Sequence, residues 1–183
     1  MTFARARALI VVGVLAVLGV GFVGFALAKD TQRGAVTART CPQGWPLVDL
    51  QLRPPEEVKI NVLNATDRPN LATQVAGDFA NRKFKVVKKG NDKKGLDKVA
   101  ALRFGPKAYG SAHLLRAYFL DEAQVQYDPA RKDDVVDVVI GDDFKQLATT
   151  TEVNQSLVEI KAPQLPPQSC EMPKTAPKAA SGS

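Results

Sequence analysis

The sequence VKINVLNATDRPNLATQVAGDFANR, residues 58–82, decides the fold of this chain. Apolar and polar residues alternate over 58–62, and a period of two is typical of a β-strand. The segment 64–70 is rich in Asn, Asp, Thr and Pro, which form turns and cap helices. Apolar residues then recur at helical spacing over 70–82, which predicts an amphipathic helix. The stretch therefore predicts a strand, a turn and a helix in immediate succession.

The residues that follow extend this pattern to a whole domain. Strands are predicted near residues 84–87, 99–104, 123–127 and 135–140, a loop over 88–98, and a second helix over about 107–121. The run VVDVVI at 135–140 is strongly apolar, so we expect it in the middle of the sheet. The predicted fold class is α/β (α+β), with two helices packed on one face of a four- to five-stranded mixed sheet, preceded by one transmembrane helix.

An apolar run without charged residues, ALIVVGVLAVLGVGFVGFALA, occupies residues 8–28. At about 1.5 Å per residue a helix of this length reaches roughly 31 Å, enough to cross a hydrocarbon core of about 30 Å. Two arginines precede it, which predicts that residues 1–7 are cytoplasmic and the C-terminal part extracytoplasmic. A signal peptide cleaved after Ala28 is the alternative, because small residues fit the cleavage pattern there. Both interpretations place residues 29–183 outside the cytoplasm.

The rest of the chain divides into one domain between two tails. We predict a stalk over residues 29–57, a domain over 58–144, and a C-terminal segment over 145–183 with a proline-rich tail. The length of 183 residues and the net charge of +6 exclude a large multidomain enzyme and a multispan transporter. Nucleic acid is not expected as a partner, because the exported part lacks interleaved aromatic residues for base stacking.

Cys41 in the stalk and Cys170 in the C-terminal segment are the two cysteines of the chain. In an exported protein such a pair favours a disulfide, which would close a loop of 129 residues. We expect this bond to hold the two tails onto the domain. Two free thiols are the alternative, and redox catalysis is not expected without a Cys-x-x-Cys motif.

The sequence contains no recognisable catalytic or metal-binding constellation. His113 is the only histidine, and we interpret it as a solvent-exposed or edge residue, with Ser111 on a different face of the helix. The aspartates between residues 133 and 143 match no calcium-loop spacing and are interpreted as turn and cap residues. The sequence therefore predicts no catalytic residue, no metal site, no cofactor and no enzyme activity.

A basic run lies between the first predicted helix and the strand at 99–104. Its members are Arg82, Lys83, Lys85, Lys88, Lys89, Lys93, Lys94 and Lys98. One interpretation is a solvated loop and helix end. The other is an electrostatic patch for an anionic partner, such as phospholipid headgroups, a phosphate-bearing polymer or an acidic protein face.

Several short motifs resemble the LytR C-terminal domain family over residues 58–144. They are VLNAT at 62–66 with Leu-Ala at 71–72, FKV at 84–86, Phe-Gly at 104–105 and VVIGDDF at 138–144. The structural positions of these motifs are Asn64, Thr66, Asn70, Leu71, Gly105, Gly141, Asp143 and Phe144. Two positions depart from the family pattern, because Asn70 and Lys83 stand where it has glycine, the residue that most readily adopts a positive φ.

The resemblance implies an extracytoplasmic module of the cell envelope, found beside or apart from enzymes that attach polymers to peptidoglycan. One apolar span before such a domain resembles the arrangement of actinobacterial, especially mycobacterial, envelope proteins. We expect a non-enzymatic, single-pass membrane-anchored adaptor for cell-envelope integrity, whose partners are the cell membrane and an envelope protein or cell-wall polymer. The alternative is a direct binding module for an anionic cell-wall polymer or lipid. Self-association is compatible with either function.

Overall fold

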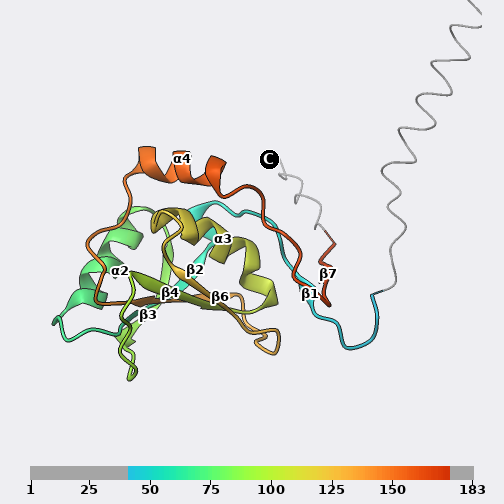
Figure 1. The fold of residues 1–183 in the computed structure, drawn as a ribbon, viewed down its shortest axis with the longest axis horizontal. Helices are drawn as coiled ribbons and strands as arrows, with labels where there is room; N and C mark the ends of the chain where they lie inside the picture. Colours follow the sequence, from blue (N-terminus) through green and yellow to red (C-terminus); the bar gives the residue numbers. More distant parts are fainter. Residues whose placement is uncertain (1–40, 174–183) are drawn as a thin grey trace, which may run out of the picture. The chain divides into compact units, whose positions relative to one another are not determined.

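The computed structural model describes residues 41–173 of the chain (Figure 1). The chain divides into two units, Met1–Pro42 and Gln43–Ser183, and the helices and strands described below all belong to the second. The predicted transmembrane helix at 8–28, the residues before it and residues 29–40 of the predicted stalk lie outside the described part. Between residues 41 and 173, no helix combines the length and the apolar character needed to span a bilayer.

Two sheets and three α-helices make up the described part of the chain. The strands are β1 (Leu47–Val48), β2 (Lys59–Asn64), β3 (Lys85–Asn91), β4 (Ala100–Phe104), β5 (Gln124–Tyr127), β6 (Val135–Ile140) and β7 (Cys170–Glu171). The helices are α2 (Leu71–Asn81), α3 (Tyr109–Tyr118) and α4 (Thr150–Glu159), with 3-10 turns η1 (Pro55–Glu57) and η2 (Pro106–Ala108). The larger sheet has the order β3-β2-β6-β4-β5, and β1 pairs with β7 alone. The predicted mixed sheet and the central place of β6 are confirmed.

The strand directions give the sheet two different ends. Strand β2 is parallel to β3 and β6, whereas β4 is antiparallel to β6. The carboxyl ends of β2, β3 and β6 therefore lie together, and the carboxyl end of β4 lies at the opposite end of the sheet. Strand β1 continues into Asp49, whose backbone exchanges hydrogen bonds with Pro106 and Gly110 just after β4. The β1–β7 pair thus lies at the end of the sheet away from the turn after β2.

The main core lies between one face of the sheet and helices α2 and α3 (Figure 1). Alternate residues of β2 and β6, together with Val58 directly before β2, point into it and are fully buried: Val58, Ile60, Val62, Val136, Val138 and Ile140. Phe79 of α2 is also fully buried, and its ring packs edge-on against Phe84 with centroids 5.2 Å apart. The side chains buried here are therefore those that the period-two and helical patterns of the sequence predict to be buried.

A third helix, α4, corrects the predicted two-helix architecture. The Thr149 side chain accepts a hydrogen bond from the Glu152 backbone, and the Glu152 carboxylate accepts one from the Thr149 backbone at 2.7 Å, which forms a capping box. The helix packs on α3, on the side away from the sheet (Figure 1). Its sequence, TTEVNQSLVE, is mostly polar, and only Val153 and Ser156 are buried, so the apolar stripe is too short to predict it.

The two positions where the chain departs from the motif keep the backbone geometry of glycine. Asn70, before α2, has a φ of 61°, and Lys83, after α2, has a φ of 71°. Residues with a Cβ are strained in this left-handed region, and asparagine tolerates it better than lysine. The turn is therefore preserved at Lys83, with a cost in conformational energy.

We expect Lys83→Gly to raise the free energy of unfolding by about 0.5–1 kcal/mol, because glycine relieves this strain. The matched control is Lys85→Gly in the extended strand β3, which we expect to lower it by about 0.5–1 kcal/mol. Urea unfolding followed by circular dichroism measures both variants. A loss of stability in Lys83→Gly as large as that in the control would contradict the prediction.

Candidate functional site

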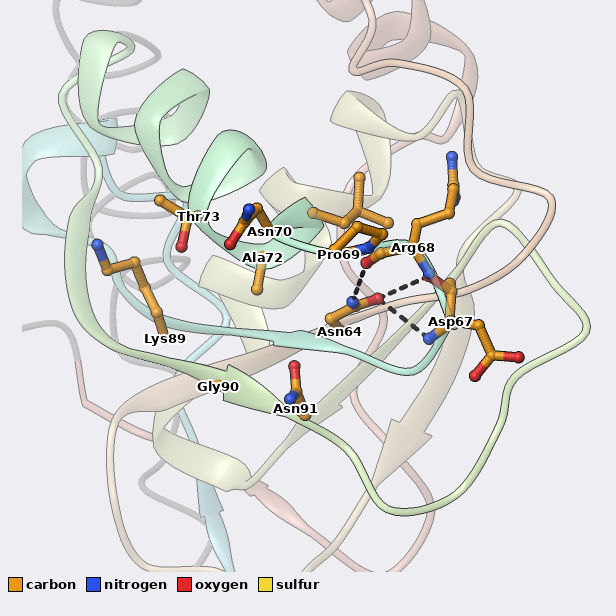
Figure 2. A pocket seen from close by; sticks show the side chains of 12 residues that line it. Asn64, Asp67, Arg68, Pro69, Asn70, Ala72, Thr73, Lys89, Gly90 and Asn91 are labelled. Atoms are coloured by element: carbon orange, nitrogen blue, oxygen red, sulfur yellow. Dashed lines mark hydrogen bonds between the residues drawn. The ribbon is translucent and has the colours of Figure 1, made fainter.

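The turn between β2 and α2 is fixed by the side chain of Asn64, which is 6% exposed. Its side-chain oxygen accepts hydrogen bonds from the backbone N–H of Thr66 at 3.0 Å and from the Thr66 hydroxyl at 2.8 Å. Its amide donates to the Arg68 carbonyl oxygen at 2.7 Å (Figure 2). The polar atoms of Asn64 are thus occupied within the turn, so this motif residue shapes the backbone.

Arg68 joins this turn to the loop that follows β6. Its guanidinium donates to the carbonyl oxygen of Phe144 at 2.9 Å and to that of Gly141 at 3.1 Å. The two ends of the motif, far apart in sequence, therefore meet at the carboxyl ends of β2 and β6. We call this assembly the motif corner: residues 64–70 together with 141–144. The sequence predicts Arg68 only as part of a turn, because a single arginine gives no signal of which carbonyl groups it binds.

The glycines of the motif allow close backbone approaches. A Cβ atom on Gly141 would lie 2.1 Å from the Lys98 carbonyl oxygen, and one on Gly105 would lie 2.5 Å from the Arg131 carbonyl oxygen. Both contacts are too short for any side chain. A side chain at either position would therefore force the neighbouring backbone to move.

A pocket of about 560 Å³ opens beside the motif corner (Figure 2). It lies at the carboxyl ends of β2 and β3 and at the first turn of α2, which begins without a side-chain capping hydrogen bond. The partial positive charge of a helix N-terminus favours anions nearby. Among its lining residues are four motif positions and one member of the basic run: Asn64, Thr66, Asn70, Leu71 and Lys89.

A β-bulge determines where Lys89 points. The register between β2 and β3 shifts so that Val86 pairs with Ile60 and Lys88 pairs with Asn61, which leaves Val87 as the extra residue. Because side chains alternate between the two faces of a strand, the bulge turns Lys88 to the open face and Lys89 to the helix face. Figure 2 shows Lys89 at the side of the pocket near Thr73. Without the bulge the two lysines would exchange faces.

The structure separates the basic run into different environments. Arg82 is a structural residue, since its guanidinium donates to the Ala148 carbonyl oxygen at 2.5 Å and lies over the Tyr118 ring. The other members are exposed, and within residues 41–173 none forms an ion pair: Lys83, Lys85, Lys88, Lys89, Lys93, Lys94 and Lys98. Strand β3 extends to Asn91, so the loop predicted over 88–98 begins later than expected.

His113 is buried, which corrects the prediction of an exposed or edge residue. Only 5% of it is exposed. Its Nε2 lies 2.8 Å from the Lys161 carbonyl oxygen, and its Nδ1 lies 3.4 Å from Nη1 of Arg116. A neutral ring that donates from Nε2 and accepts at Nδ1 satisfies both partners. The prediction was wrong because the chain after α4, which the sequence pattern did not place, packs over this part of α3.

We expect the domain to lose stability as the pH falls from about 7 toward 5. Burial lowers the pKa of His113, and this effect exceeds the raising effect of the hydrogen bond to the Lys161 carbonyl; the charges of Arg116 and Asp121 lower and raise the pKa by smaller amounts. The unfolded chain, with a histidine pKa of about 6.5, then binds protons that the native state does not, so stability declines below this value. Urea midpoints at about pH 7.5 and 5.5 measure the decline. Because the chain has one histidine, His113→Gln should abolish most of it, and an unchanged decline would contradict the assignment.

Three of the aspartates between residues 133 and 143 pair with cationic side chains. Within residues 41–173, no group of three or more His, Cys, Asp or Glu side chains is placed to hold a metal ion. Asp133 and Asp137 both pair with Arg131, at 2.9 Å and 2.8 Å, and Asp134 pairs with Lys59 at 2.8 Å. These aspartates are therefore occupied by cationic side chains on the face of the sheet that the helices leave open.

Cys41 and Cys170 are disulfide-bonded, as the sequence predicts. Beside this bond the two tails also pair through their backbones, because the N–H of Cys170 donates to Pro46 and that of Met172 donates to Val48. We call residues 43–57 and 161–173 the two straps. They meet in the short β1–β7 sheet.

Comparison with known proteins gives one family and one solved structure. Residues 57–144 match the family described as LytR cell envelope-related transcriptional attenuator. The chain is also similar to the crystal structure of the soluble domain of a conserved hypothetical secreted protein from Mycobacterium marinum. That match has a TM-score of 0.49 and 28% sequence identity, over 61% of this chain and 73% of the other. No curated protein matches the chain.

Proposed function

Residues 57–144 belong to the LytR C-terminal domain family, and from this premise we propose that the protein is a non-enzymatic, membrane-anchored adaptor of the cell envelope. The family description connects the domain with the envelope. The observation that carries the proposal is the use of the motif residues: Asn64, Thr66 and Arg68 bond to one another and to the 141–144 loop. Side chains engaged in this way hold a binding surface in shape, which is what an adaptor requires.

The membrane anchor in this proposal is the apolar run at residues 8–28, and the domain lies on the extracytoplasmic side. The disulfide supports this location, because such bonds persist in oxidising compartments outside the cytoplasm. The domain would then act next to the outer leaflet, where it contributes to envelope integrity by binding an envelope component.

The second candidate function is direct binding of an anionic cell-wall polymer or lipid, and the orientation of Lys89 favours it. Lys89 lines the pocket beside the first turn of α2, while Lys88 and Lys85 extend the positive charge along the exposed edge strand. An exposed cation without a counter-charge attracts anions over about one Debye length, roughly 8 Å at physiological salt. If the protein is an adaptor, the same lysines would bind an acidic surface of its protein partner.

A charge reversal in the native host tests the adaptor function. Lys89→Glu should make cells more sensitive to detergents and wall-active antibiotics, as a deletion of residues 58–144 should. The matched control is Lys107→Glu on η2, an exposed lysine at the opposite end of the sheet, which should leave sensitivity unchanged. Equal sensitivity of the deletion strain and the wild type would refute the proposal.

Binding by the purified full chain separates the two candidates. Cosedimentation with isolated wall polymer, or with vesicles of anionic lipid, requires no protein partner. If binding is direct, it should weaken with added salt and fall at least about tenfold when Lys88, Lys89, Lys93 and Lys94 are all changed to Ala, a loss of 1.4 kcal/mol or more. Binding that resists both salt and these substitutions would exclude the direct function, and a protein partner would remain.

A further inference from the structure

The straps expose a group of large apolar side chains, which we call the strap surface: Trp45, Leu47, Leu52 and Leu165. Their exposed fractions are 42%, 46%, 47% and 43%. The other large apolar residues exposed in the described part lie apart along the sequence: Val87 on β3, Leu120 after α3, Val125 on β5 and Val158 on α4. Single exposed apolar residues are ordinary, whereas several gathered on two paired segments indicate a contact surface.

The two straps present these side chains on a fixed framework. Trp45 and Leu47 are two residues apart along an extended segment and so project to the same side, while Val48 points inward and is fully buried. A groove of about 660 Å³ runs between the straps. Apolar side chains from both straps line it: Leu50, Leu52, Ala162, Pro163, Met172 and Pro173.

The chain that precedes the described part indicates what this surface meets. The apolar run ends at residue 28, and the twelve residues 29–40 separate it from Cys41. Twelve extended residues reach at most about 43 Å, so the tether keeps the strap end of the domain close to the bilayer. The disulfide fixes the end of this tether at Cys41, because Cys41 is bonded to Cys170, the first residue of β7.

We propose that the strap surface rests on the lipid interface, with Trp45 at the level of the headgroups, an inference that rests on the proposed membrane anchor. Tryptophan suits this position, because it is amphipathic and is enriched at membrane–water interfaces. The pocket and Lys89 lie at the opposite end of the sheet, and the six residues of β2 alone span about 20 Å. Lys89 therefore faces the wall, and the anionic partner is a component of the wall side and not the headgroups of the anchoring membrane.

Tryptophan fluorescence tests this orientation directly, because Trp45 is the only tryptophan of the chain. The full chain is placed in vesicles of phosphatidylglycerol and phosphatidylcholine whose acyl chains carry bromine just below the headgroups. We expect strong quenching of Trp45 and a shift of its emission to shorter wavelength. Leu47→Ser together with Leu52→Ser should abolish most of the quenching while the chain stays anchored.

The matched control moves the tryptophan away from the straps, onto the edge strand β3. Trp45→Phe combined with Val87→Trp places it on β3, at a site whose native side chain is 61% exposed. This variant should show little quenching by the same lipids. If the native protein is quenched no more than the control, the proposed orientation is wrong.

Anchoring is measured separately by flotation of the full chain with the vesicles in alkaline carbonate. A chain that floats without quenching of Trp45 overturns the strap contact and leaves the anchor intact. A chain that does not float overturns both the anchor and the contact. Flotation with quenching confined to Trp45 supports the proposal.

Discussion

Gly141→Ala should unfold the domain or lower its free energy of unfolding by about 3 kcal/mol or more, the range of severe overpacking in a closed site. The new Cβ would lie 2.1 Å from the Lys98 carbonyl oxygen and 2.5 Å from the Leu96 carbonyl oxygen, so the backbone must move. Three backbone hydrogen bonds join residues 141–143 to residues 96–99. The N–H groups of Gly141, Asp142 and Asp143 donate to the carbonyl oxygens of Val99 at 3.1 Å, Leu96 at 2.9 Å and Lys98 at 3.3 Å, respectively. Movement of either segment breaks them.

The matched control is Gly77→Ala in α2. A Cβ there meets no atom within 4 Å, and alanine favours a helix over glycine by roughly 1 kcal/mol. We expect this variant to be slightly more stable than the wild type. Urea unfolding followed by circular dichroism compares the two alanine variants, which make the same chemical change. A Gly141→Ala variant as stable as Gly77→Ala would show that residues 96–98 do not pack on the motif corner as described.

Removing the disulfide is the second change with a large expected effect. The bond closes a loop of 129 residues between positions 41 and 170. The chain-entropy treatment assigns about 5 kcal/mol to such a loop, and removal of native disulfides commonly costs about 2–5 kcal/mol. We therefore expect Cys41→Ser with Cys170→Ser to lower the free energy of unfolding by a similar amount.

Two further measurements make this prediction specific. A reducing agent should lower the urea midpoint of the wild type and leave that of the double variant unchanged. The backbone N–H groups of Cys170 and Met172, which hold β7 to the other strap, should exchange with solvent faster in the double variant. An oxidised protein no more stable than the double variant would contradict the role of the bond.

Local patterns were sufficient to predict much of this fold. The alternation at residues 58–62 and the helical spacing at 70–82 each predict that one face of the strand or helix is buried, and the structure buries those faces. The glycine positions of the motif predicted positive φ at Asn70 and Lys83, which the backbone adopts. Patterns of this kind are local, because each residue's role depends on neighbours within one turn or one strand.

The features that the sequence did not predict depend on contacts between distant segments. Helix α4 buries few side chains and is stabilised by its capping box and by α3, so its own apolar pattern is weak. The burial of His113 follows from the segment after α4, at Lys161. Lys89 faces the pocket because of a register shift against β2, which no feature of β3 alone reveals.

Site-specific photocrosslinking in living cells tests the central claim most directly, namely that the Lys89 end of the domain binds an envelope component. A photoreactive amino acid replaces Lys89 in one strain and Lys107, at the opposite end of the sheet, in another. We predict adducts with a wall-side component from position 89 and none of these from position 107, with protease or glycan hydrolase digestion distinguishing a protein from a polymer. The same adducts from both positions, or none from position 89, would contradict the account.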